Sequence, residues 1–114
     1  MCIHEGDLKM AIVKVSNEPA LRIKLPEILW NHAGFNSEKI ATECYIVCNN
    51  DTGTEFSVFT KDPGTHIDWN MNADYKRRIS LSPFTTGVKP GDEFRVTAKK
   101  GCIHVKKIDL VSED

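Results

Sequence analysis

The stretch RISLSPFTTGVKPGDEFRVTAKKGCIHVKKI, which runs from Arg78 to Ile108, decides the expected fold of this chain. It opens with a short alternating strand and then leaves room for about one helical turn. Pro90 and Gly91 occupy the two central positions of a turn, and a strand–turn–strand hairpin follows with Gly101 at its turn. Apolar and polar residues alternate along both hairpin strands, which predicts strands with one buried face.

A related stretch lies in the first half of the chain. ALRIKLPEILWNHAGF, residues 20–35, also runs Arg-Ile-x-Leu, then a proline beside a short helix, then a glycine followed by an apolar residue. Pro26 suits the first turn of a helix, and Gly34 can end that helix in a left-handed conformation. A hairpin follows here too, because TECYIVC and TEFSVFT flank NNDTG. We therefore interpret the chain as one strand–helix–hairpin unit used twice.

The chain as a whole has the pattern of a small, mainly-β domain. Its 114 residues predict a single domain over residues 1–114, and 40% hydrophobic with 27% charged residues is normal for a soluble globular protein. We place unit one at about residues 10–60, an irregular connector at about 61–75 and unit two at about 76–110. The fold expected from this repeat is a small barrel of two pseudo-symmetric units with one short helix.

These motifs resemble the AbrB/MazE/SymE-like swapped-hairpin, or cradle-loop, β-barrel family. The sharpest piece is GVKPGDEFRV, residues 87–96, and ALRIKLPEILWNHAGF is similar to the opening of the unit in SymE-like members. The second half departs from the pattern by lacking a proper helix, and the first half by lacking the Gly-Asp turn. The resemblance implies a monomeric pseudo-dimer, in which one chain supplies both units, or a homodimer. A double-psi barrel, also built from two such halves, is the competing topology.

The resemblance implies DNA binding by basic residues near the start of each unit. The corresponding residues here are Arg22, Lys24, Lys76, Arg77 and Arg78. Guanidinium groups hold phosphates and guanine edges bidentately, and we expect Arg22 and Arg78 to occupy matching places and to address successive half-sites. The function expected on this basis is that of a DNA-binding regulator or an antitoxin-like protein.

Other interpretations of the basic residues remain open. They are equally well explained as a solvated sheet face, which the net charge of −1 favours. A second basic cluster lies at KKGCIHVKK, residues 99–107. A SymE-like, RNA-associated toxin is a further alternative that the same resemblance allows.

The connector contains a second candidate surface. HIDWNMN, residues 66–72, is polar and carries Trp69, with His66 and Asn70 beside it. Long loops often carry function, and an exposed tryptophan is a common anchor for a protein partner. The alternative function is therefore a non-catalytic interaction module or inhibitor, for example phage- or defence-related, that binds a larger protein. Equally, Trp69 could fold back as a lid on one end of the barrel.

Metal binding and catalysis have little support in the sequence. MCIH and GCIH each place a cysteine two residues before a histidine, and alternation predicts that Cys102 and His104 face outward together. These spacings are not those of known zinc knuckles, so we expect no metal and no cofactor. No nucleophile elbow, phosphate-binding loop or dinucleotide glycine pattern occurs, so nothing favours an enzyme.

The expected environment is the cytoplasm. The four cysteines are predicted to be free thiols, since Cys44 and Cys48 would lie about 13 Å apart on an extended strand. The first residues do not form a secretory signal. No apolar run is long enough to span a membrane, so no membrane partner is expected.

Overall fold

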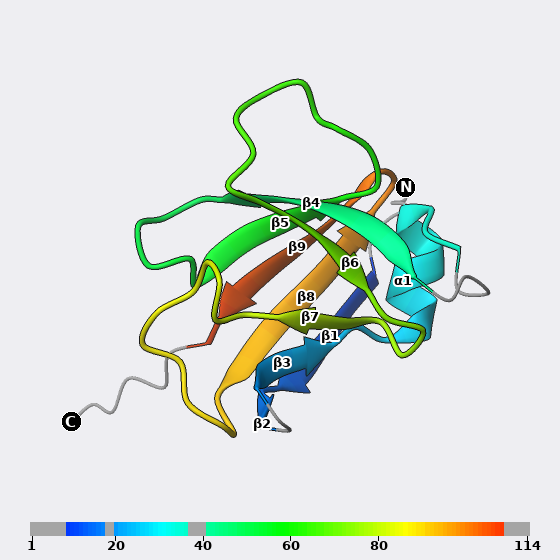
Figure 1. Cartoon of the computed structure of the whole chain (residues 1–114). Helices are drawn as coiled ribbons and strands as arrows, with labels where there is room; N and C mark the ends of the chain where they lie inside the picture. Colours follow the sequence, from blue (N-terminus) through cyan, green and yellow to red (C-terminus); the bar gives the residue numbers. More distant parts are fainter. Residues whose placement is uncertain (1–8, 18–19, 37–40, 109–114) are drawn as a thin grey trace, which may run out of the picture.

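The computed structural model describes residues 9–17, 20–36 and 41–108, which form two antiparallel sheets and one short helix (Figure 1). The larger sheet has six strands in the order β1-β8-β9-β5-β4-β6, and the smaller has three in the order β2-β3-β7. The bounds are β1 Lys9–Lys14, β2 Ser16–Asn17, β3 Leu21–Lys24, α1 Glu27–Ala33, β4 Thr42–Cys48, β5 Glu55–Phe59, β6 Trp69–Ala73, β7 Arg78–Ser80, β8 Glu93–Lys99 and β9 Cys102–Lys107.

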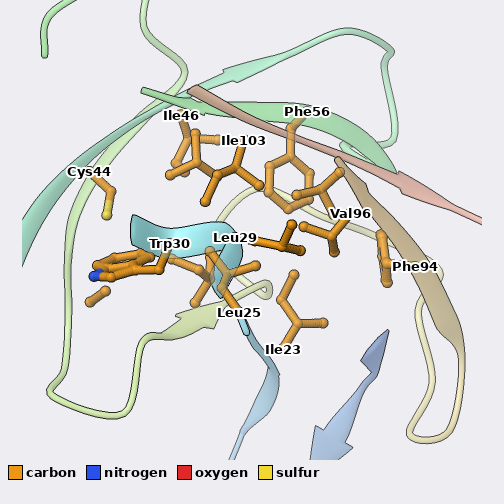
Figure 2. Close-up of a cluster of buried hydrophobic side chains, with 14 of the residues drawn as sticks. Ile23, Leu25, Leu29, Trp30, Cys44, Ile46, Phe56, Phe94, Val96 and Ile103 are labelled. Atoms are coloured by element: carbon orange, nitrogen blue, oxygen red, sulfur yellow. The ribbon is translucent and has the colours of Figure 1, made fainter. Parts of the chain in front are cut away.

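The core lies between the inner face of the six-stranded sheet and a layer made of β3, β7 and α1. Alternate residues of the strands point into it, so Ile23 and Ile79 from the small sheet and Phe56, Phe94 and Ile103 from the large one are fully buried. Figure 2 shows the side chains of these layers converging from both sides. The described residues thus share one hydrophobic core. Burial of one face of each strand against this core explains why apolar and polar residues alternate in the sequence.

Helix α1 begins and ends where the sequence predicts. Pro26 precedes it in an extended conformation, and Gly34 follows it with φ of +105°. The Gly34 N–H donates to the Asn31 carbonyl at 3.0 Å, and the Phe35 N–H donates to the Trp30 carbonyl at 3.1 Å. These two bonds form a Schellman motif. They bring the Phe35 ring onto the Trp30 indole, with the ring centroids 4.0 Å apart.

The strand pairing of the small sheet is symmetric about one residue pair. Ile23 of β3 lies directly opposite Ile79 of β7. Two hydrogen bonds flank this pair in equivalent positions, from the Leu25 N–H to the Arg77 carbonyl and from the Leu81 N–H to the Leu21 carbonyl, both at 2.9 Å. A local twofold axis through the Ile23–Ile79 pair therefore relates the two strands.

The large sheet has the same symmetry. β5 and β9, the second strands of the two hairpins, pair at its centre, with β4 and β8 outside them. β1 then adds to the second hairpin and β6 to the first. Each hairpin tip also contacts the opposite half, because the Gly101 N–H donates to the Ala33 carbonyl at 2.9 Å and the Thr86 N–H to the Thr52 carbonyl at 2.8 Å.

Two sequence-based expectations about the fold are wrong. The six-stranded sheet is not closed, because β1 and β6 form its two edges, so it is not the closed barrel that we expected. The segment at about residues 61–75, predicted to be an irregular connector, contains strand β6. The run WNMNA is short and polar, but its Met71 and Ala73 face the core opposite β4 while its asparagines face outward. The run does alternate apolar and polar residues, but it is only five residues long and contains no β-branched residue.

Gly53 gives a test of the contact between the first hairpin tip and the second half. It has φ of +70°, and an added Cβ would overlap the Phe84 carbonyl. Its own carbonyl accepts a hydrogen bond from the Thr85 hydroxyl at 2.9 Å. We expect Gly53→Ala to lower the free energy of unfolding by about 3 kcal/mol, since steric overlap adds to the cost of a positive φ.

Urea denaturation measures this change, and Gly91→Ala is its matched control. Gly91 also has a positive φ, of +92°, but no atom lies within 4 Å of its added Cβ. We expect this control to cost about 1 kcal/mol from backbone strain alone. Equal losses in the two variants would contradict the close approach at Gly53.

Candidate functional site

The outward side of the small sheet carries a group of basic and hydroxyl side chains. In antiparallel pairs, residues directly opposite each other share a face, and so do residues two apart on one strand. The register places Arg22 opposite both Ser16 and Ser80, and Lys24 opposite Arg78. We call this surface the basic face; its members are Ser16, Arg22, Lys24, Arg78 and Ser80. Because Ile23 and Ile79 occupy the other side of the sheet and are fully buried, the basic face points away from the core.

Arg22 occupies the middle of the basic face and is incompletely bonded. Its side chain is half-buried, and its Nε is buried with no hydrogen-bond partner among the described residues. It is the only buried side-chain nitrogen or oxygen without a partner in that part of the chain. A buried donor without an acceptor costs about 1–3 kcal/mol, and more when the group is charged. Because the Nε is buried, an external anion reaches this guanidinium only through its other nitrogen atoms or after the side chain moves.

Arg78 is already paired with an acid. Its Nε donates to Asp74 Oδ2 at 2.7 Å, and its Nη2 forms an ion pair with the same oxygen. Asp74 Oδ1 accepts the N–H groups of Lys76 at 3.0 Å and Arg78 at 3.2 Å. Burial by itself would raise the pKa of Asp74, but these hydrogen bonds and the Arg78 charge lower it overall. The bond to Asp74 in turn raises the pKa of Arg78, which keeps the guanidinium charged. The Asp74 carboxylate offsets part of that charge within the chain.

Arg77 forms hydrogen bonds to neighbouring backbone carbonyls through both its side chain and its backbone. Its φ of +61° is the only positive value at a non-glycine residue in the described part of the chain. Its Nε donates to the Leu25 carbonyl at 2.9 Å, and its N–H donates to the Asp74 carbonyl at 2.9 Å. Arg77 thus ties the start of β7 to the end of β3 and has a positioning role.

Lys24 and Lys76 are the exposed cations of this region. The Lys76 Nζ lies 5.6 Å from the centroid of the Tyr75 ring, and Tyr75 is itself 59% exposed. Asp74 is the only described carboxylate bonded or ion-paired to any of the five predicted basic residues. The local charge is therefore strongly positive, although the chain as a whole carries −1.

The expectation that Arg22 and Arg78 address successive half-sites is wrong. They do occupy places related by the twofold of the small sheet, as predicted. However, they are diagonal neighbours on adjacent strands, which sets their backbones about 7–8 Å apart. Half-sites of a DNA duplex lie about 34 Å apart. The basic face is therefore one compact patch, too short to span two half-sites.

The three residues predicted to bind a protein partner do not share a surface. Trp69 lies opposite the buried Ile46 on the inner face of β6 and is 41% exposed, so it is neither a free anchor nor a buried lid. Asn70 faces the other side, and its Nδ2 donates to the Cys44 carbonyl at 3.4 Å. His66 precedes the strand, and its Nε2 is hydrogen-bonded to Asp68 Oδ1 at 3.2 Å. A flat partner could not contact all three at once.

Cys102 and His104 share the outer face of β9, as alternation predicted, but they are not two exposed ligands. Cys102 is 8% exposed, because its small side chain lies between Phe59 and Lys99 on the neighbouring strands. His104 is half-buried and bonds Glu55 at 2.8 Å. Cys2 and His4 lie outside the described residues. Within the described ranges, no three His, Cys, Asp or Glu side chains gather as a metal site requires.

The three described cysteines are free thiols with little nucleophilic character. Burial raises the pKa of Cys44 to about 12, and it also raises the pKa of Cys48 and of Cys102. A thiol attacks as its thiolate, so raised pKa values leave these groups protonated at neutral pH. They act as small core side chains.

Sequence analysis missed a polar pocket of about 470 Å³ at the first hairpin tip. It lies between the β4–β5 turn and the turn at Pro83 and Phe84, with Cys48 and Asp68 on its wall. Asp68 Oδ2 accepts a hydrogen bond from the Cys48 N–H at 2.7 Å. These segments are distant in the sequence and meet only through the hairpin-tip contact, so no local signal could have revealed the pocket.

The comparisons add no relative to this geometry: no family model, no curated protein and no solved structure matches the chain. In the described ranges, no helix has both the length and the apolar character needed to cross a membrane.

Asp74→Asn tests the pairing that holds Arg78. We expect a loss of about 0.5–1 kcal/mol in the free energy of unfolding near neutral pH, since 32% of the Arg78 and 34% of the Asp74 side chain is exposed and water screens the pair. The pKa of Asp74 is lowered in the folded state. Its contribution is therefore complete above the unfolded-state pKa of about 3.9 and is lost as the pH falls through the folded-state value.

The difference between wild type and Asp74→Asn should accordingly shrink below about pH 4. Thermal or urea unfolding over a pH series measures it. Asp51→Asn is the control, because Asp51 is exposed and forms no ion pair among the described residues. A difference that persists unchanged at acid pH would contradict the assigned ion pair.

Proposed function

We propose that this protein binds the phosphate backbone of nucleic acid through the basic face, as a DNA-binding regulator or antitoxin-like protein. The observation that carries the proposal is the gathering of Arg22, Lys24 and Arg78 on the outward side of the small sheet, where Asp74 is the one described carboxylate that pairs with any of them. Phosphate oxygens are the acceptors that guanidinium groups bind best. The Ser80 hydroxyl, directly opposite Arg22, is a further donor of the kind that contacts DNA backbone, whereas the Ser16 hydroxyl already donates to the Arg22 carbonyl at 3.4 Å.

We also propose that the chain is a pseudo-dimer of two swapped-hairpin units. The proposal is supported by the symmetric register of β3 with β7 and by the central pairing of β5 with β9. It is supported as well by the contact of each hairpin tip with the helix or turn of the other half. In this interpretation one chain carries the twofold that two chains supply in AbrB-like proteins, with an open sheet in place of a closed barrel.

The small number of free cations sets the expected binding strength. Three basic side chains have no acidic partner among the described residues: Arg22, Lys24 and Lys76. Arg78, in contrast, forms an ion pair with Asp74. Three phosphate contacts predict a slope of about −3 in a plot of log affinity against log salt for duplex DNA. Such contacts position a duplex without reading its sequence.

Salt titration of duplex binding tests the proposal. We expect Arg22→Ala and Lys24→Ala each to weaken binding and to reduce the slope by about one, because each removes one phosphate contact. Fluorescence anisotropy of a labelled duplex between about 50 and 200 mM salt gives both quantities. Arg22→Lys keeps the charge and loses the fork, so it should retain the slope while binding more weakly.

Lys61→Ala is the control for a general loss of charge. Lys61 is exposed and lies in the segment between β5 and β6, away from the basic face. We expect its affinity and slope to match those of wild type. Unchanged binding in both Arg22→Ala and Lys24→Ala would refute the proposal, and so would an equal loss in Lys61→Ala.

A further inference from the structure

A second pair of cations lies on the other sheet. Arg95 of β8 and Lys106 of β9 are directly opposite each other, and both are exposed on the outer face of the six-stranded sheet. Like charges in this arrangement destabilise a sheet. Neither side chain forms an ion pair with a described residue. The fold thus maintains an unneutralised pair at a cost to its own stability.

The acids nearest this pair along the strands do not neutralise it. Glu55 lies opposite Lys106 on the other neighbouring strand, but its carboxylate bonds His104 at 2.8 Å. Glu93 is two residues before Arg95 on the same face and lies opposite Lys14 of β1, and it forms no ion pair with Arg95 or Lys106. Within the described part of the chain, the two cations therefore have no ion-pair partner.

A small pocket lies beside the pair. It has a volume of about 220 Å³ and is lined by Arg95, Lys106, Lys107 and Ile108. The backbone around it is fixed, because the Lys107 N–H donates to the Thr54 carbonyl and the Ile108 N–H to the Glu93 carbonyl, both at 2.8 Å. The strand ends thus fix the backbone positions from which the two cations extend beside the pocket.

We propose that this pocket binds a small phosphoryl anion between Arg95 and Lys106. The volume is below the roughly 300 Å³ at which pockets for drug-sized ligands begin, so it suits a phosphate or diphosphate group rather than a whole nucleotide. Arg95 supplies a planar fork and Lys106 a compact point charge, which together match phosphate oxygens. The site lies on a different sheet from the basic face, so the inference goes beyond the proposed function and does not depend on it.

The phosphoryl group could belong to a free phosphate compound or to the terminal phosphate of a nucleic-acid strand. Sodium pyrophosphate is the probe for the shared chemistry, titrated into the full chain and followed by calorimetry. We expect saturable binding that Arg95→Gln and Lys106→Gln each weaken tenfold or more. Lys99→Gln is the matched control, because Lys99 is an exposed cation on the same strand and face as Arg95, and it should bind within twofold of wild type.

A second measurement distinguishes the two sources. A single-stranded oligonucleotide is compared with and without a 5′-phosphate; a preference for the phosphorylated strand that Arg95→Gln abolishes identifies the terminal phosphate as the ligand. Equal binding of both strands, with pyrophosphate bound, assigns the site to a free phosphate compound. Either result supports the anion site.

Two results would overturn the inference. One is the absence of saturable pyrophosphate binding, and the other is equal weakening by Arg95→Gln and Lys99→Gln, which would indicate diffuse electrostatic attraction. Loss of folding does not confuse the test, because relieving the like-charge pair should leave Arg95→Gln with the same or a higher melting temperature. The site is also separable from the basic face: Arg22→Ala should retain pyrophosphate binding and Arg95→Gln should retain duplex binding.

Discussion

The pairing of Ile23 with Ile79 is the constraint on which the rest of this structure depends. Both side chains are fully buried, and the two strands that carry them are linked by hydrogen bonds in equivalent positions on either side. Burial of a large aliphatic side chain contributes about 1.5–3 kcal/mol, so this pair anchors the small sheet to the core. The alternation of a strand then forces the flanking residues Arg22, Lys24 and Arg78 outward. The basic face is a direct consequence of that burial.

The same pair sets the places of the two hairpins. Each short strand leads into a helix or turn, and each helix or turn receives the hairpin tip of the other half. Each half is therefore incomplete alone, because its hairpin tip packs on the partner half and its edge strand pairs with the partner hairpin. This interdependence explains how a sheet with two open edges can still enclose a single core.

Local chemistry made much of the fold predictable from the sequence. Pro26 and Gly34 located the helix, and the alternation of EFRVTA and CIHVKK located the last hairpin. Strand β6 was missed because it is only five residues long and lacks the β-branched residues that mark strands. The sequence placed basic residues on β3 and β7 but did not show how they are paired. The Arg77 bond to the Leu25 carbonyl is a tertiary contact, and the Asp74–Arg78 bridge, although its residues are only four apart, forms across a turn that contains the positive φ of Arg77; no sequence pattern predicts either.

The registers also show where the two halves have diverged. Ser57 lies opposite His104 at the centre of the large sheet, so the twofold places Tyr45 and Phe59 of the first hairpin where Arg95 and Lys106 stand in the second. One half thus carries an aromatic pair on the outer face, and the other a pair of cations. A dimer of identical chains would have to repeat the same pair twice, whereas two units in one chain can differ. An aromatic pair and a cation pair at related positions are possible because the two hairpins of this single chain differ in sequence.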